Sequence, residues 1–286
     1  MIKLNKVRKL IGTFMLKDVT LELPCGYIIG LIGANGCGKT SLLHILLGLY
    51  QPRCGEVEIM GMKYPSNEKE LHDEIGVVLQ ERLFEDYMSL LENARFYGRF
   101  YSHYDEPYFL KLLKTYELDA KKKYKHLSKG EELKFQFAFA LAHHPKLLLL
   151  DEPTGNFDPE FREEFLKALT AFIADGEHTI ILATHLTDDL DKIADYIIYM
   201  EQGYVLFATD IEEIRSRYRI VAGDDYKMKL LPEKYVIHME KGEFSTKALM
   251  RHRKVSEYDK QLTVTTPTIE EWMYFISKRE RGVDIC

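Results

Sequence analysis

The chain has 286 residues, of which 46% are apolar and 29% are charged, a composition typical of a folded globular protein with one or two domains. Its 39 basic and 45 acidic residues give a net charge of −6, which disfavours nucleic-acid binding through bulk positive charge. The sequence has no run of roughly eighteen apolar residues and no apolar signal-peptide core behind its basic N-terminus, so we expect neither a transmembrane helix nor a secretory leader.

The cysteines favour a reducing compartment. The sequence has four of them, without the spacing of metal ligands: Cys25, Cys37, Cys54 and Cys286. One lies inside a glycine-rich loop described below, so we predict free thiols in a cytosolic chain.

Residues 1–60 are predicted to be rich in strands. Partial alternation of apolar residues over 14–23 and a short β-prone segment at 56–60 each indicate a strand. Between them, the apolar run 27–32 is typical of a buried strand, and residues 40–47 have the apolar spacing of a helix.

A glycine-rich loop connects that strand to that helix. Its sequence fits the pattern G-x-x-x-x-G-K-T and consists of Gly33, Ala34, Asn35, Gly36, Cys37, Gly38, Lys39 and Thr40, with Ser41 following. Glycines allow consecutive backbone N–H groups to approach a polyphosphate, Lys39 adds a charge for the outer phosphates, and the Thr40 hydroxyl can bind Mg²⁺. A glycine-rich turn that binds nothing is the alternative, and the coincidence of strand, loop, lysine and helix disfavours it.

The rest of the chain alternates strands and helices before its pattern weakens. Segments 75–79, 147–150 and 179–183 are predicted buried strands, with a helix near 159–174. Near-continuous apolar strands separated by helices favour an α/β fold with a parallel core sheet covered on both faces. Aromatic-rich helices over about 84–145 are predicted to form an inserted helical subdomain. After about residue 210, short strands at 234–238 and 261–264 precede a final helix near 268–280.

Two acidic residues, Asp151 and Glu152, end the apolar strand 147–150. A buried strand that delivers a carboxylate at its carboxyl end places it beside a phosphate loop. Asp151 is therefore a predicted Mg²⁺ ligand, and Glu152 the predicted general base that polarises a water for attack on the γ-phosphate. A solvated strand end would be the simpler interpretation if this pair occurred without the loop.

Four further sequence features lie before and after these two acids in the chain. They are Gln80 at the end of a strand, Leu127-Ser128-Lys129-Gly130-Glu131 before a helix that extends to Leu141, Asp158 after Gly155-Asn156-Phe157, and His185 after the strand 179–183. With the phosphate loop and the strand-end acids, they resemble the nucleotide-binding subunit of an ABC (ATP-binding cassette) transporter over about residues 1–210. Singly, each has a simpler interpretation: a surface glutamine, a helix N-cap serine or a loop histidine.

The resemblance implies a role for each feature. Gln80 matches the Q-loop glutamine that senses Mg²⁺ and connects to the helical subdomain, and Asp158 matches the D-loop. Ser128, Lys129, Gly130 and Glu131 match the LSGGQ signature, which contacts the γ-phosphate of ATP on a partner subunit. His185 matches the switch histidine, which contacts the γ-phosphate, so the predicted catalytic set is Glu152, His185 and Gln80, with Mg²⁺ held by Thr40, Gln80 and Asp151.

The sequence departs from the family pattern in two places. Lys129 and Glu131 replace a glycine and the glutamine of the signature, a form similar to that of bacterial exporter ATPases of the ABC-2 type. The aromatic residue that stacks on adenine in the family should fall near Leu10, and Phe14 is a weak substitute. His143 and His144 gain no role and are predicted surface residues at a helix end.

The fold implied is a P-loop NTPase cassette with antiparallel N-terminal strands, the helical insertion at about 84–145 and a small α+β extension over 211–286. The implied activity is ATP hydrolysis with ATP and Mg²⁺, in a homodimer or heterodimer of cassettes arranged head to tail. The implied partner is a separate transmembrane permease, so the chain would be cytoplasmic and peripheral on the inner face of the cell membrane. One alternative is a non-transport ABC ATPase acting on a soluble macromolecular partner such as a ribosome or DNA, although no nucleic acid is expected. Another is a module that holds ATP without turnover.

Overall fold

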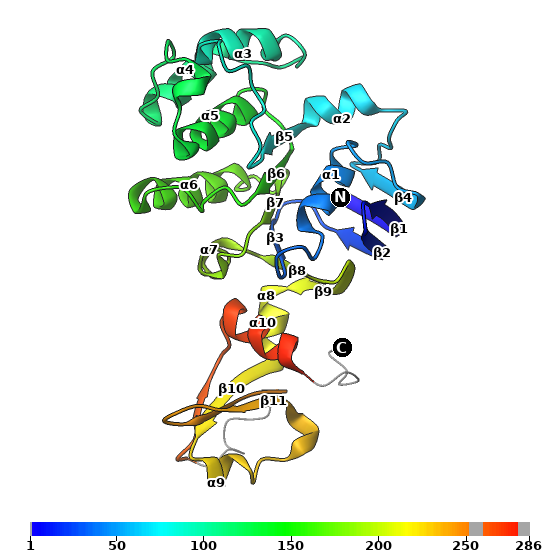
Figure 1. Cartoon of the computed structure of the whole chain (residues 1–286), viewed down its shortest axis with the longest axis vertical. Helices are drawn as coiled ribbons and strands as arrows, with labels where there is room; N and C mark the ends of the chain where they lie inside the picture. Colours follow the sequence, from blue (N-terminus) through cyan, green and yellow to red (C-terminus); the bar gives the residue numbers. More distant parts are fainter. Residues whose placement is uncertain (1, 252–259, 280–286) are drawn as a thin grey trace. The chain divides into compact units, whose positions relative to one another are not determined.

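The computed structural model of the chain describes residues 2–251 and 260–279. It divides into two compact units (Figure 1). The first unit extends to Leu186 and includes Tyr196–Ala208, and the second contains Thr187–Asp195 and the residues from Thr209 onward. The chain therefore passes into the second unit, returns to complete the sheet of the first, and enters the second unit again.

A six-stranded sheet forms the centre of the first unit. In spatial order its strands are β5 (Ile75–Val78), β6 (Leu147–Asp151), β7 (Thr179–Ala183), β3 (Ile28–Ile32), β8 (Tyr196–Glu201) and β9 (Tyr204–Asp210). The pairs from β5 to β8 are parallel, and every residue of β3, β6 and β7 is buried. Apolar runs form these central strands because both faces of the sheet are covered, and the predicted parallel core sheet is confirmed.

A three-stranded antiparallel sheet lies in the same unit. Its order is β2 (Phe14–Leu23), β1 (Ile2–Ile11) and β4 (Cys54–Ile59). Helix α1 (Lys39–Leu46) packs with both sheets in one apolar core, to which Leu4, Leu21, Leu43 and Leu149 belong. This core holds the start of α1 against the carboxyl end of the central strands.

The helical segment lies at one end of the unit (Figure 1). Its elements are α3 (Leu90–Gly98), α4 (Glu106–Thr115), a 3-10 turn (Tyr124–His126) and α5 (Lys129–Leu141), while α2 (Glu68–Glu74) precedes β5 and α6 (Pro159–Phe172) follows β6. Phe84 is the centre of its aromatic packing, in edge contact with Tyr97, Tyr124, Phe135 and Phe139 at centroid distances of 4.6 to 5.7 Å. Such edge-to-face pairs add to the burial of apolar area.

His143 is buried, and the prediction that it lies at the surface is wrong. It is only 2% exposed, its ring stacks on Tyr101 with centroids 4.2 Å apart, and its Nε2 lies 3.2 Å from the Ile75 carbonyl oxygen. The aromatic packing of the helical segment covers it, a long-range effect that its neighbours in the sequence did not indicate. His144 is exposed, as predicted.

The second unit is built on a four-stranded antiparallel sheet. Its order is β11 (Val236–Lys241), β12 (Thr246–Arg251), β10 (Tyr218–Gly223) and β13 (Thr263–Thr265). Its helical elements are α7 (Thr187–Ile193), α8 (Ile211–Arg217), α9 (Asp225–Met228), a 3-10 turn (Glu233–Tyr235) and α10 (Ile269–Lys278). The Asp191 carboxylate of α7 accepts the Ile269 N–H at 3.1 Å, which ties α7 to the start of α10.

No helix in the described ranges, 2–251 and 260–279, has the length and apolar character needed to cross a membrane.

Candidate active site

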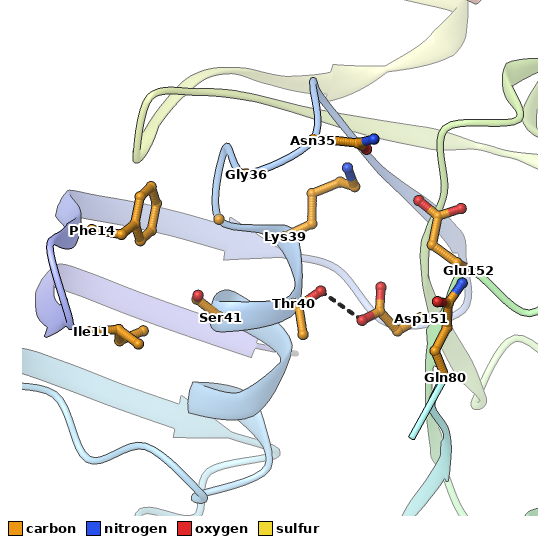
Figure 2. Close-up of a pocket in the computed structure, with 11 residues that line it drawn as sticks. Ile11, Phe14, Asn35, Gly36, Lys39, Thr40, Ser41, Gln80, Asp151 and Glu152 are labelled. Carbon is orange, nitrogen blue, oxygen red and sulfur yellow. Dashed lines mark hydrogen bonds between the residues drawn. The ribbon is translucent and has the colours of Figure 1, made fainter. Parts of the chain in front are cut away.

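A pocket of about 430 Å³ lies where the glycine-rich loop meets the carboxyl ends of the central strands (Figure 2). Its lining comes from segments far apart in the sequence: Ile11, Phe14, Asn35, Gly36, Gly38, Lys39, Thr40, Ser41, Gln80, Asp151 and Glu152. The fold thus brings the predicted loop, the predicted strand-end acids and Gln80 around one space.

The loop has backbone geometry that only glycine adopts readily. Gly36 and Gly38 have φ values of 78° and 114°, in the left-handed region that penalises side chains. A Cβ atom on Gly38 would also lie 2.8 Å from the side chains of Phe14 and Leu16. The loop therefore keeps its backbone exposed toward the pocket, as a phosphate cradle requires.

Lys39 is the first residue of α1 and is only 7% exposed. Its Nζ donates to the Gly33 carbonyl oxygen at 2.9 Å, which folds the side chain back over the loop (Figure 2). A cation held above a ring of backbone N–H groups at a helix N-terminus is suited to a polyphosphate anion.

Thr40 and Asp151 meet at the base of the pocket. The Thr40 hydroxyl donates to Asp151 Oδ2 at 2.7 Å. Burial raises the pKa of Asp151, although the Thr40 hydrogen bond opposes that shift. A bound cation would stabilise this buried carboxylate, and the donor set of hard oxygens fits Mg²⁺.

Glu152 follows β6, and its side chain is oriented by the strand next to it. Its backbone has φ 49°, unusual for a residue with a side chain, and its N–H donates to the Ala183 carbonyl at 2.8 Å. Its Oε2 lies 2.7 Å from His185 Nδ1 and 3.2 Å from the His185 backbone nitrogen. Glutamate and histidine thus form a hydrogen-bonded pair at the pocket edge, with His185 itself outside the lining residues.

Gln80 follows β5 and lines the pocket together with Asp151 and Glu152 (Figure 2). On the opposite side, Phe14 and Ile11 line the pocket near the loop. Leu10 is 47% exposed and does not line it. Ile11 was not among the predicted site residues; its place follows from the strand alternation that turns it and Leu10 to opposite faces of β1.

The signature-like residues lie outside this pocket. Ser128 is the N-cap of α5 and forms a capping box with Glu131: the Glu131 N–H donates to Ser128 Oγ at 3.3 Å, and the Ser128 N–H donates to Glu131 Oε2 at 2.8 Å. Burial opposes ionisation of Glu131, but hydrogen bonds from Lys122 and Ser128 lower its pKa. The carboxylate at the usual glutamine position therefore stabilises the helix start.

The predicted D-loop residue caps the next helix along the chain. The Asp158 carboxylate accepts the Phe161 N–H at 2.9 Å, which lowers its pKa, and it lies 3.8 Å from Lys134 Nζ of α5. Gly130 lies close to the preceding turn, since a Cβ there would be 2.8 Å from the Asn156 carbonyl oxygen. The predicted D-loop segment and the start of α5 thus lie side by side.

Three residues of α5 bind the segment 79–82: Lys129, Glu132 and Gln136. The sequence did not predict this contact. Lys129 Nζ donates to the Gln80 carbonyl oxygen. No local sequence pattern indicates a contact between residues so far apart, although the unusual lysine in the signature was itself a signal.

Sequence comparisons show which known proteins the chain is similar to. The ABC transporter family matches residues 16–155. The Nod factor export ATP-binding protein I of Cupriavidus metallidurans is 31% identical over 208 residues, which cover 71% of this chain and 68% of that protein. The ABC transporter ATP-binding protein YtrB of Bacillus subtilis is 29% identical over 221 residues, covering 76% and 75% of the two chains.

A structural comparison gives the same result. An ATP-binding cassette solved as a dimer in a post-hydrolysis state, with ADP and Pi bound, superposes with a TM-score of 0.66 and 28% identity. The match covers 74% of this chain and 99% of that one.

Proposed function

The chain belongs to the ABC transporter family and is an ATP-binding, ATP-hydrolysing cassette, and from this premise we propose that it drives a separate membrane permease that exports its substrate. The observation that carries the proposal is the pocket in which the glycine-rich loop, Asp151 and Glu152 converge. The relative named for Nod factor export supports the direction of transport.

ATP occupies the pocket with its phosphates on residues 33–41. The backbone N–H groups of the loop and the Lys39 amine bind the phosphates, because the glycine conformations leave that backbone open and Lys39 is already held over it. The base lies toward Phe14 and Ile11, with the Phe14 ring as the aromatic contact in place of a residue near Leu10.

Thr40, Asp151 and the Gln80 amide oxygen hold Mg²⁺, since they are the hard oxygen donors at the base of the pocket. Mg²⁺ held there would supply positive charge that offsets the negative charge of the phosphates.

Glu152 acts as the general base on the water that attacks the γ-phosphate. His185 Nδ1 fixes the Glu152 carboxylate through one oxygen, and the other oxygen accepts the proton of that water. Gln80 lines the same pocket as both acids and orients the water and the metal ligands.

Two cassettes meet head to tail in the working enzyme. The residues Ser128, Lys129, Gly130 and Glu131 lie outside their own pocket but present the exposed N-terminus of α5, an anion-binding end of a helix. In a head-to-tail pair this end contacts the γ-phosphate bound by the other copy, with Asp158 at the interface. ATP binding closes the pair and hydrolysis reopens it.

Residues 1–210 form the cassette, with the helical subdomain at about 84–145, and residues 211–286 form an extension. The cassette lies in the cytoplasm, on the inner face of the membrane through its permease. A non-transport ABC ATPase acting on ribosomes or DNA is not favoured, because the relatives are transporter components and the net charge of −6 offers no bulk attraction to nucleic acid.

Affinity capture tests the permease assignment. A tagged Glu152→Gln chain is recovered from detergent-solubilised native membranes with ATP and Mg²⁺, beside a tagged Lys39→Ala chain as a control. Stoichiometric recovery of a polytopic membrane protein with the first variant is expected. Recovery of only ribosomes, DNA or soluble proteins with both variants would overturn the transport assignment and leave the ATPase chemistry standing.

A further inference from the structure

One face of α5 binds the backbone that follows β5. Gln136 Oε1 accepts the Leu79 N–H at 2.8 Å, and Gln136 Nε2 donates to the Glu81 carbonyl oxygen at 3.0 Å. Gln136 is 1% exposed, so both hydrogen bonds are shielded from water and costly to lose. They join the middle of α5 to the chain on either side of Gln80.

Two further residues of the same face extend this contact to the start of α5. Lys129, Glu132 and Gln136 are spaced by three and four residues, which places them on one side of a helix. Lys129 Nζ donates to the Gln80 carbonyl oxygen and lies 3.3 Å from Glu132 Oε2. Glu132 is 4% exposed, and its other oxygen lies 2.6 Å from Arg82 Nη2.

The buried Glu132 carboxylate therefore holds two cations in place. Arg82 comes from the segment after Gln80, and Lys129 comes from the first turn of α5. A desolvated carboxylate binds such partners more strongly than an exposed one, and removal of either cation leaves it undercompensated. Lys129 is thereby held at the Gln80 carbonyl and kept from rotating freely into solvent.

This contact links two places that the proposed function assigns to different ATP molecules. The Gln80 side chain lines the pocket of its own chain. Its carbonyl is bound by Lys129, the residue next to Ser128 at the exposed start of α5. A displacement of that helix start must move the Gln80 carbonyl with it, or break the Lys129 contact.

We propose that Lys129 is a positioning residue that couples the two ATP sites of the dimer, a proposal that rests on the head-to-tail arrangement above. When the partner's ATP engages the start of α5, Lys129 transmits the displacement to Gln80 and so adjusts its position in the pocket that Asp151 and Glu152 also line. A glycine at position 129, as in the common family pattern, has no side chain to make this connection.

The test compares steady-state ATP hydrolysis by the full chain in four forms: wild type, Lys129→Met, Lys129→Arg and Lys167→Met. Lys167 is the matched control, a lysine paired with Glu163 on α6 at 2.7 Å and well exposed. For Lys129→Met we expect kcat to fall about tenfold with ATP affinity within about twofold of wild type, because only the positioning of Gln80 is lost. The Hill coefficient for ATP should fall toward about 1, since coupling is what makes it larger.

Lys129→Arg should recover most of the wild-type kcat and cooperativity, because its guanidinium keeps the charge and can donate to the same carbonyl. Lys167→Met should behave like wild type. Glu132→Gln gives an independent check in the same direction, since it releases Lys129 without altering position 129.

Three other results would contradict the proposal in different ways. A cooperative wild type with an equally cooperative Lys129→Met variant overturns the coupling and leaves the dimer standing. A loss of ATP affinity in Lys129→Met larger than its loss of kcat overturns the positioning role, because the amine then binds nucleotide directly. A wild type that binds ATP but shows no cooperativity and no ATP-dependent dimer overturns the head-to-tail arrangement together with the coupling.

Discussion

His185 Nδ1 and Glu152 Oε2 lie 2.7 Å apart, although the two residues are separated by more than thirty positions in the chain. They meet because β6 and β7 are parallel neighbours in register, with Asp151 opposite Ala183, so that the residues after each strand come together. The His185 side chain is 57% exposed and the Glu152 side chain is 14% exposed. The residue that follows β7 therefore sets the orientation of the mostly buried Glu152 carboxylate.

Replacement of Glu152 by glutamine should abolish hydrolysis and keep ATP binding. The introduced amide retains the size of the side chain and a hydrogen bond to His185 but cannot accept a proton. We expect phosphate release to fall by about 10²- to 10⁴-fold, the usual contribution of a general base, with ATP affinity unchanged by titration calorimetry. Near-wild-type turnover in this variant would remove Glu152 from the role of base.

Replacement of Lys39 by alanine should abolish tight ATP binding. The change removes both the cation and its anchor on the Gly33 carbonyl. We expect the dissociation constant for ATP to rise at least about tenfold, equivalent to about 1.4 kcal/mol of binding free energy. Thermal unfolding without nucleotide is the control for loop damage, and unchanged affinity in a folded variant would contradict the phosphate-loop assignment.

His143 should make the protein less stable in acid. Burial lowers the pKa of His143 below its unfolded value near 6.5. Below that pH the unfolded chain takes up a proton that the folded chain excludes, so the free energy of unfolding falls as pH falls, by at most about 1.4 kcal/mol per pH unit.

The two adjacent histidines allow a matched measurement. His143→Gln and His144→Gln are unfolded in urea between roughly pH 5 and pH 7, a range around the ordinary histidine pKa. The first variant should lose part of the wild-type pH slope, and the second changes the adjacent, exposed histidine for comparison. Equal slopes in both variants would show that His143 does not titrate on unfolding.

Cys37 should resist alkylation while the chain is folded. It is 4% exposed, and burial raises its pKa, so little reactive thiolate is available. Cys25 and Cys54 are exposed. We expect maleimide to modify both of these at least about ten times faster than Cys37 near neutral pH, as accessibility and thiolate fraction require.

Peptide mass spectrometry separates these sites from Cys286, which lies outside the described residues. Alkylation in denaturant is the control, and there Cys37 should react like the others. Equal rates in the folded chain would contradict the buried loop geometry.

Local patterns predicted the parts of the fold that depend on neighbours in the sequence. The apolar runs that became β3, β6 and β7 are buried on both faces and could be recognised without knowing what covers them. The glycine pattern of residues 33–40 prescribes its own backbone. The roles of Glu152, His185 and Gln80 stay predictions, although the structure brings their side chains to one edge of the sheet.

Long-range packing explains what the sequence did not reveal. His143 is buried because Tyr101 stacks on it from another segment. Lys129 binds the Gln80 carbonyl oxygen because α5 lies along residues 79–82. Similarly, α7 packs in the second unit through Asp191 and Ile269, although the strands before and after it belong to the first. Each depends on partners far away in the chain, which periodicity does not report.

The most direct test of the head-to-tail pair is the mass of the Glu152→Gln chain in solution, measured by light scattering with and without ATP and Mg²⁺. We expect a single 33.4 kDa chain without nucleotide and a particle of twice that mass with ATP, which is lost again when Ser128 is also changed to a bulky residue. A chain that binds ATP yet keeps its single-chain mass would contradict an ATP site completed by a second cassette.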